Sequence, residues 1–172
     1  MKSALANRIV FVLALAGAGV AGYLTLAHLH YMELVCGPLH GCDVVASDPR
    51  AHGLGIPALS GIPTAAFGLA MYLAVAALSF LRVVFSERTA RTAARLQWLL
   101  ALGGVVVAAW LTWVEGAVIH AWCQWCVASA IITLLIFITL SAAAARRAPE
   151  VGTDPVATPG AESAPLGSRP GG

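Results

Sequence analysis

Long apolar runs alternate with short polar segments along this sequence, and the pattern recurs four times. The apolar runs cover residues 9–29, 63–81, 96–119 and 123–145, and Glu115 interrupts the third near its end. Each run is close to the length of about 20 mostly apolar residues that a helix needs to cross a bilayer. Because the bilayer core offers no water to backbone groups, helices are the expected spanning form. The pattern therefore predicts an all-α membrane protein, a bundle of four transmembrane helices.

Composition supports this prediction, since 59% of the 172 residues are hydrophobic and only 10% are charged. Soluble domains contain about 25% charged residues. Lys2 and Arg8 precede the first apolar run, so a cleaved signal peptide is an alternative for this segment. The run is longer than the apolar core of a usual signal peptide, and we interpret it as a span.

Basic residues indicate the orientation of the bundle. Only Arg50 lies in the segments on one side, whereas the other side holds Lys2, Arg8, Arg82, Arg88, Arg91, Arg95, Arg146 and Arg147. Because cytoplasmic loops concentrate Lys and Arg, both termini are predicted to be cytoplasmic. The net charge of +2 is then a topology signal and gives no indication of nucleic-acid binding. Residues 30–62 become a long outer loop, which we expect to cap the bundle as a lid; an ordinary connecting loop is the alternative.

The chain divides into two regions by composition. Residues 1–145 contain all the apolar runs and are expected to form one transmembrane catalytic domain. Residues 146–172 contain five prolines and five glycines and almost no bulky apolar residue. Such a segment cannot bury a core, so we predict a disordered cytoplasmic tail without a soluble redox domain.

The four cysteines fall in two close pairs, and both pairs are predicted on the outer side. Cys123 and Cys126 open the fourth run as Cys-x-x-Cys, and Cys36 and Cys42 lie in the long loop. A cysteine at a helix N-terminus is favoured as a thiolate, the form that attacks a disulfide. We expect Cys123 to face the loop pair and Cys126 to face the bundle interior, where a quinone dissolved in the bilayer could reach it. Two structural disulfides and a four-thiolate zinc site are the alternatives.

Two further residues are candidates for auxiliary roles. Glu115 could supply a proton for quinone reduction, but its predicted depth is shallow, and we favour a carboxylate that reaches interfacial water. Trp125 could stack on a quinone ring, although membrane-interface anchoring explains most tryptophans near this boundary. The histidines His28, His30, His40 and His52 match no compact metal-binding motif, and we interpret them as interfacial residues.

Several motifs together resemble the vitamin K epoxide reductase family, in particular its bacterial disulfide-forming members. The resemblance covers residues 9–145, most of the chain. It rests on the pairs Cys36/Cys42 and Cys123/Cys126, on Asp43-Val-Val-Ala-Ser47 after the loop pair, and on Ile62-Pro-Thr-Ala-Ala-Phe-Gly-Leu-Ala-Met-Tyr72 at the start of the second run. It implies a four-helix bundle around a quinone, either ubiquinone or menaquinone.

The resemblance also implies roles for the cysteines. Cys126 would face the quinone, Cys123 would exchange with Cys42, and the pair of Cys36 and Cys42 would reoxidise a DsbA-like, thioredoxin-fold partner. Because the predicted tail is short and polar, this partner is expected to act in trans. The protein would then be a thiol:quinone oxidoreductase of the bacterial inner membrane, with its cysteines facing the periplasm; a non-enzymatic scaffold with structural disulfides is the alternative.

The sequence departs from the family pattern at three places. The usual loop serine lies six residues after the second loop cysteine, where this chain has Asp48, and Ser47 lies one residue earlier. Many members carry a tyrosine where this chain has Ala130, and Thr64 takes the polar position before Phe67-Gly, where animal members have asparagine. The predicted quinone contacts are therefore Thr64, Phe67, Trp125 and Ala130.

Overall fold

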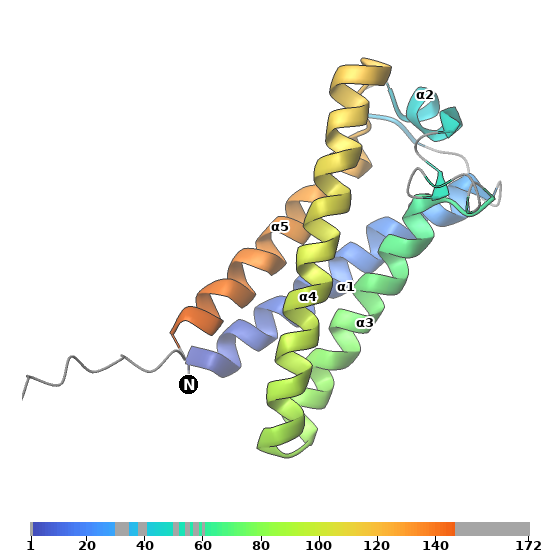
Figure 1. The fold of residues 1–172 in the computed structure, drawn as a ribbon. Coiled ribbons are helices and arrows are strands. Elements are labelled where there is room, and N and C mark those ends of the chain that lie inside the picture. The colour runs from blue at the N-terminus through green and yellow to red at the C-terminus, as the bar shows by residue number, and fades with distance from the viewer. Residues whose placement is uncertain are drawn as a thin grey trace, which may run out of the picture.

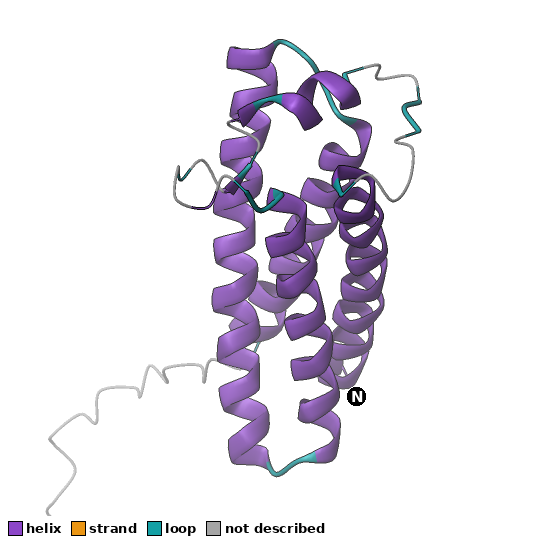
Figure 2. Cartoon of the chain, turned by 90° about the vertical axis from the view of Figure 1, so that its right-hand side faces the viewer, coloured by secondary structure: helices purple, strands orange, loops and turns teal. Residues whose placement is uncertain are grey.

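The computed structural model describes residues 2–29, 35–37, 41–49, 52–53, 56, 59 and 61–146. Within this part of the chain the structure is helical (Figures 1 and 2). The predicted disordered tail lies outside it except for Arg146, and so do His30, His40 and Arg50.

Four long helices form the body of the molecule. They are α1 (Lys2–His28), α3 (Thr64–Val84), α4 (Glu87–Trp113) and α5 (Gln124–Ala145). The short helix α2 (Cys42–Ser47) lies in the long loop, and α4 continues as a π-helix, η4 (Val114–Ile119). All four long helices are long and apolar enough to cross a membrane, which confirms the predicted four-helix membrane protein.

Two helices begin earlier than the apolar pattern predicts. Helix α1 begins at Lys2 and not at residue 9, and α4 begins at Glu87 and not at residue 96. Hydropathy detects only the part of a helix that lies in the hydrocarbon region, whereas backbone hydrogen bonding continues into water. The first turns of α4 carry exposed arginines, Arg88, Arg91 and Arg95, so the sequence there is helical without being apolar.

The long helices form a closed ring in the order α1, α3, α4, α5. Helix α1 packs against α3 and α5, and α4 packs against the same two neighbours (Figure 1). The buried core between them includes Val10, Tyr72, Val75, Ala101 and Ile136. Many large apolar side chains instead point outward, as expected for a surface in contact with lipid: Val12, Leu73, Phe80, Val106, Leu134 and Ile138.

Buried polar side chains tie three of the helices together in the half of the bundle away from the long loop. Asn7 Nδ2 of α1 donates to the Ser79 carbonyl at 2.9 Å. Gln97 Nε2 of α4 donates to Ser79 Oγ at 2.7 Å and to the Val75 carbonyl at 3.0 Å. Arg82 Nη1 donates to Gln97 Oε1 at 2.7 Å. Since polar groups facing lipid are costly, this network fixes which faces of these helices turn inward.

The described parts of the long loop lie at the other end of the bundle. Helix α2 contacts η4 there, and His52 pairs with Pro63 at the start of α3 in an isolated β-bridge (Figure 1). His52 Nε2 also makes a 2.8 Å hydrogen bond with the Ala46 carbonyl of α2. These contacts place α2 beside the loop end of the helices, so the loop segment with Cys42 is held against the bundle.

Candidate redox site

Two aromatic residues on different helices hold the segment that contains Cys36. The Tyr23 hydroxyl of α1 accepts a hydrogen bond from the Val35 N–H at 2.7 Å. Trp125 Nε1 of α5 donates to the Val35 carbonyl at 3.0 Å, and the two rings lie 4.9 Å apart. The residue next to Cys36 is thereby bound on both sides of its backbone, which positions this cysteine near the start of α5.

Two glycines let the loop approach the start of α5 closely. A Cβ atom at Gly41 would lie 2.7 Å from the Trp122 backbone nitrogen and 2.8 Å from its carbonyl oxygen. A Cβ atom at Gly37 would collide with the Gln124 side chain. Gly41 therefore requires glycine for a steric reason, because backbone atoms occupy the space that a Cβ atom would need, whereas the movable end of the Gln124 side chain can give way at Gly37. Gly41 brings the adjacent Cys42 against the residues that precede Cys123.

The four cysteines lie in one cluster. Cys42 and Cys123 are fully buried, Cys36 and Cys126 are half-buried, and Val45, Ile119 and Trp125 pack around them. All four carry free thiols in the structure, with the Cys42 thiol hydrogen-bonded to Cys36 and the Cys126 thiol to Cys123. The prediction that the two pairs converge at one end of the bundle is confirmed.

Cys123 caps the N-terminus of α5, as its position in the sequence predicts. The hydrogen bond from the Cys126 thiol, together with the backbone N–H groups of Cys126 and Trp125, lowers the pKa of Cys123 from 9.0 to about 6. Burial and the nearby Glu115 carboxylate oppose this shift but do not cancel it. Above about pH 6 Cys123 is therefore a thiolate, the reactive form of the side chain.

Cys42 is the opposite case. Burial, the hydrogen bond with Cys36 and the charge of Cys123 raise the pKa of Cys42 to about 12, and the Gln124 backbone N–H opposes them. Cys42 thus remains a protonated thiol at neutral pH while Cys123 beside it is ionised. The two buried sulfur atoms therefore differ in charge. Cys123 receives hydrogen bonds at the start of a helix, which stabilise its thiolate, whereas burial disfavours the thiolate of Cys42.

Glu115 is part of this cluster, which corrects the interpretation that we favoured from the sequence. Its side chain is only 2% exposed and does not reach interfacial water. Glu115 Oε2 accepts a hydrogen bond from the Cys123 backbone N–H at 3.1 Å, and the carboxyl group is hydrogen-bonded to the Cys126 thiol. The sequence cannot show that the chain between η4 and α5 folds back over this side chain.

The backbone around Glu115 explains this burial. Helix α4 widens into the π-helix η4, a feature that often marks functional sites. His120 ends η4 in the left-handed conformation, with φ of 57° and ψ of 31°. The N–H of Ala121 then donates to the Glu115 carbonyl at 3.1 Å. This reversal directs residues 120–123 back across the end of α4 and sets Cys123 above the carboxylate.

A cavity of about 380 Å³ opens directly below the cysteines, between the four long helices. Cys42, Cys123, Cys126 and Glu115 border it at the loop end, and most of the remaining wall is apolar. The volume lies within the range of about 300–1,000 Å³ that is usual for small-molecule sites. The arrangement places redox-capable sulfur and a buried carboxyl group at the edge of a space within the membrane-spanning bundle.

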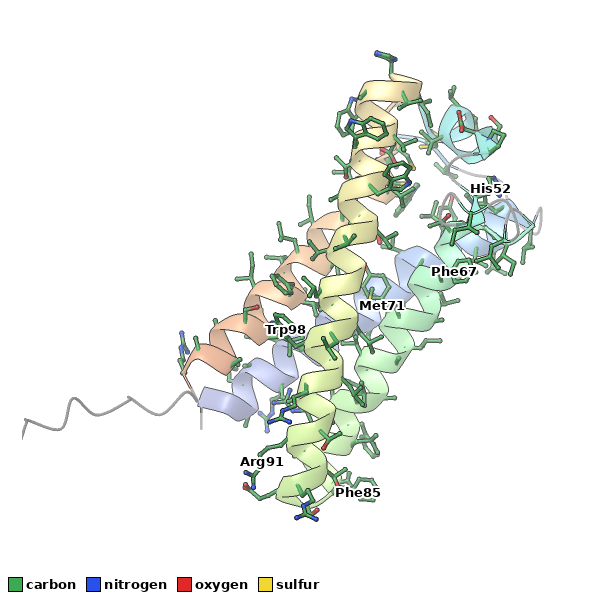
Figure 3. All side chains as sticks on the ribbon, in the orientation of Figure 1. His52, Phe67, Met71, Phe85, Arg91 and Trp98 are labelled. Carbon is green, nitrogen blue, oxygen red and sulfur yellow. The ribbon has the colours of Figure 1, made fainter. Side chains whose placement is uncertain are left out.

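The predicted quinone contacts divide into two groups. Thr64, Phe67 and Ala130 border the cavity, and Figure 3 shows Phe67 and Met71 on the half of α3 nearest the loop end. Trp125 does not border the cavity, because its ring packs on Tyr23 and its indole N–H binds the loop. Trp125 instead holds the loop in the structure, and its contact with a quinone stays a prediction.

The two loop residues predicted to be auxiliary also lie outside the cavity. Ser47 is exposed, and its hydroxyl donates back to the Asp43 carbonyl of its own helix at 2.8 Å. Asp48 follows as the C-cap residue of α2. Neither is among the residues that border the cavity. Cys42, Val45 and Ala46 are the α2 residues that reach it, because their spacing places them on one face of this short helix.

One polar group of the cavity wall was missed from the sequence. The Tyr72 hydroxyl is hydrogen-bonded to Thr133 Oγ1 at 2.7 Å and to Ser129 Oγ at 2.9 Å, and all three residues border the cavity. Ser129 and Thr133 are four residues apart on α5, so they share one face of the helix. Two hydroxyls four residues apart in the cysteine half of this mostly apolar span were the signal, since polar groups in a membrane helix usually turn inward.

Comparison with known families fits this geometry. The profile of the Vitamin K epoxide reductase family matches residues 8–141, well over half of the chain. The chain belongs to the vitamin K epoxide reductase family. No curated protein matches it closely. Members of this family are membrane oxidoreductases that in general use a quinone as electron partner, so this chain is a membrane-embedded oxidoreductase.

Proposed function

We propose that the protein is a thiol:quinone oxidoreductase that reoxidises a thioredoxin-fold, disulfide-forming partner acting in trans. We place it in the inner membrane of a bacterium with its cysteines facing the periplasm, because the basic residues gather at the opposite end of the bundle. One observation carries the proposal: both cysteine pairs pack together at the mouth of a cavity inside the bundle.

The first step transfers electrons from the partner to the loop pair. A thiolate of the reduced partner attacks a disulfide between Cys36 and Cys42, and the second partner thiol then releases the partner as a disulfide. Cys36 and Cys42 become thiols with the two electrons and two protons that the partner loses. The half-buried Cys36 is the more accessible sulfur of the pair, so it is the atom that we expect the partner to attack.

The second step moves the same electrons into the membrane. The Cys42 thiol gives up its proton and attacks the Cys123 sulfur of a Cys123–Cys126 disulfide, and Cys126 leaves and takes up a proton. Cys36 then gives up its proton, attacks the Cys42 sulfur and releases Cys123 as a thiolate. The pKa of about 6 supports the second of these exchanges, in which Cys123 leaves, because a sulfur with a low pKa is the better leaving group. The exchange ends with a loop disulfide and with two reduced cysteines beside the cavity.

The last step returns the membrane pair to its disulfide. A quinone accepts two electrons and two protons when it is reduced to the quinol. We assign one of these protons to Cys126, which passes it to the Glu115 carboxylate hydrogen-bonded to its thiol, and the other to the proton that Cys36 releases at the loop end. Thr64 and the Tyr72–Ser129–Thr133 group supply polar contacts to an otherwise apolar cavity, a donor set that fits quinone oxygens.

Quinone reduction by the purified protein, supplied with a reduced DsbA-like partner, tests the whole sequence of steps. Cys126→Ala should abolish turnover, since the electrons then have no route to the quinone. Glu115→Gln should slow quinone reduction by about 10²–10⁴-fold, the usual contribution of a general base to a rate. The glutamine still accepts a hydrogen bond from the Cys123 N–H, but it cannot accept a proton. Ser47→Ala is the matched control, because Ser47 lies outside the cavity. Full turnover by Cys126→Ala would show that the assigned relay is wrong.

The two alternatives make different predictions in the same preparation. If both pairs were structural disulfides, Cys→Ser changes would lower stability and no mixed disulfide with a partner would form on a non-reducing gel. If the four thiols held zinc, the purified protein would contain it in a stoichiometric amount. In the described part of the chain, no three His, Cys, Asp or Glu side chains are arranged to hold a metal ion.

A further inference from the structure

A second hollow lies at the end of the bundle opposite to the cysteines. It has a volume of about 590 Å³ and lies against α3, α4 and α5. Its wall combines three arginines with an apolar surface, formed by Arg82, Arg91, Arg95, Trp98, Leu99 and Leu140. No cysteine borders it, so this arginine groove is separate from the redox site.

The arginines are arranged on two sides of the groove. Arg91 and Arg95 are exposed and lie four residues apart, and therefore on one face of α4. Arg82 comes from α3 and is half-buried, and its Nη1 donates to Gln97 Oε1 at 2.7 Å. Gln97 is itself fully buried and bonded to Ser79, so the Arg82 guanidinium is held in place by a rigid polar network.

Charge at this end of the bundle is strongly unbalanced. Among the residues whose side chains are described, Glu87 is the one carboxylate here, against the basic residues Arg8, Arg82, Arg88, Arg91, Arg95 and Arg146. The planar guanidinium of arginine matches a phosphate group, which it can bind through two parallel hydrogen bonds. Three guanidiniums around one hollow therefore form a site for an anion, most suitably a phosphate.

The rest of the groove is apolar and ordered. Trp98 Nε1 donates to Ser141 Oγ at 3.0 Å, and its ring lies 5.8 Å from the Phe137 ring. Figure 3 shows Arg91 near the start of α4 and Trp98 further along the helix toward the middle of the bundle. The groove therefore changes from basic to apolar in the direction in which a lipid changes from headgroup to acyl chain.

We propose that the arginine groove binds an anionic phospholipid of the leaflet at this end of the bundle. Its phosphate lies between Arg82, Arg91 and Arg95, and one acyl chain lies along Trp98 and Leu140. A free phosphate ion would use only the basic part of the groove, whereas a phospholipid uses both parts. Basic pockets between transmembrane helices are general binding places for anionic headgroups.

Quenching of tryptophan fluorescence by brominated acyl chains measures this binding in the full-length protein in detergent micelles. Brominated phosphatidylglycerol should quench at lower concentration than brominated phosphatidylcholine, and Trp98→Phe should remove the saturable part of the signal. Arg91→Gln with Arg95→Gln should weaken binding roughly 25-fold, since each basic residue near a lipid surface contributes about fivefold. Arg88→Gln with Arg146→Gln removes the same charge outside the groove and should change binding little.

A second variant fills the hollow without changing charge. Ala144 is exposed and borders the groove, so Ala144→Trp should reduce quenching as the arginine changes do. If Arg91→Gln with Arg95→Gln and Arg88→Gln with Arg146→Gln weakened lipid binding equally, the proposal would be overturned, because binding would then follow total charge. Full competition by inorganic phosphate would also overturn it, in favour of a free-anion site. No redox turnover enters this measurement, so its outcome is independent of the proposed relay.

Discussion

At the scale of single residues, the two buried cysteines show how position decides reactivity. Cys123 caps α5 and receives hydrogen bonds, whereas Cys42 is surrounded mainly by apolar atoms. The same functional group is therefore ionised in one case and protonated in the other. This asymmetry gives the proposed exchange a preferred direction, because Cys123 leaves as a thiolate more readily than its neighbour.

The asymmetry predicts a pH titration that can be measured directly. In the fully reduced protein, the ultraviolet absorbance of thiolate should rise with a midpoint near pH 6, because Cys123 is protonated below its lowered pKa and ionised above it. Cys126→Ala should move this midpoint upward, since the main stabilising hydrogen bond is lost. Cys123→Ser should remove the step, and a wild-type midpoint near pH 9 would contradict the assignment.

The sequence predicts the sulfur atoms of the site better than their surroundings. Cys-x-x-Cys at the start of an apolar run indicates a helix N-terminus, and two pairs on one side indicate convergence. For Glu115 and Trp125 the sequence gives only the predicted depth in the membrane, and this depth does not determine the direction in which a side chain points. Glu115 turns inward because the left-handed His120 reverses the chain above it, and Trp125 turns to the loop because Val35 lies beside it.

At the scale of the helices, close packing of α1 on α3 depends on one small residue. A Cβ atom at Gly17 would collide with the Tyr72 ring. That ring cannot move aside easily, because its side chain is fully buried and its hydroxyl is bound to Ser129 and Thr133 on α5. The contact therefore also bears on the cavity wall, to which Tyr72 belongs.

Alanine at Gly17 should lower the free energy of unfolding by about 1–3 kcal/mol, the usual cost of overpacking a core. A Cβ atom at Gly19, on the same helix, has nothing within 4 Å, so Gly19→Ala should cause no loss. Denaturant unfolding in detergent micelles compares the two variants. Adding Tyr72→Leu should recover part of the Gly17→Ala loss, and a simple sum of the two single effects would contradict the packing argument.

At the scale of the whole molecule, both ends of the bundle have a distinct chemical character. The loop end carries the cysteines and the cavity, and the other end carries the arginines. Four apolar runs were enough to predict this architecture, because a membrane leaves few alternatives. The order of the helices around the ring could not be predicted, since it follows from contacts such as Asn7 with Ser79 between distant segments.

Labelling of intact cells with a membrane-impermeant maleimide should distinguish the two ends. In a cysteine-free background, Ser47→Cys on α2 should react from outside the cell membrane, because the loop end is proposed to face the periplasm. Ser86→Cys, between α3 and α4, should react only after the membrane is permeabilised. Both positions are exposed, so access to water is matched. Labelling of Ser86→Cys in intact cells would reverse the proposed orientation.

The ring order has a consequence for biosynthesis. Helix α5 lies between α4 and α1, so the circle stays open on one side until the final span leaves the ribosome and enters the bilayer. Until then helix α5 does not cover the inward-facing hydroxyl groups and the Glu115 carboxylate of the first three spans, so these polar groups are exposed to lipid. A nascent chain arrested before residue 124 should consequently be a target for membrane quality-control proteases, whereas the completed chain should escape them.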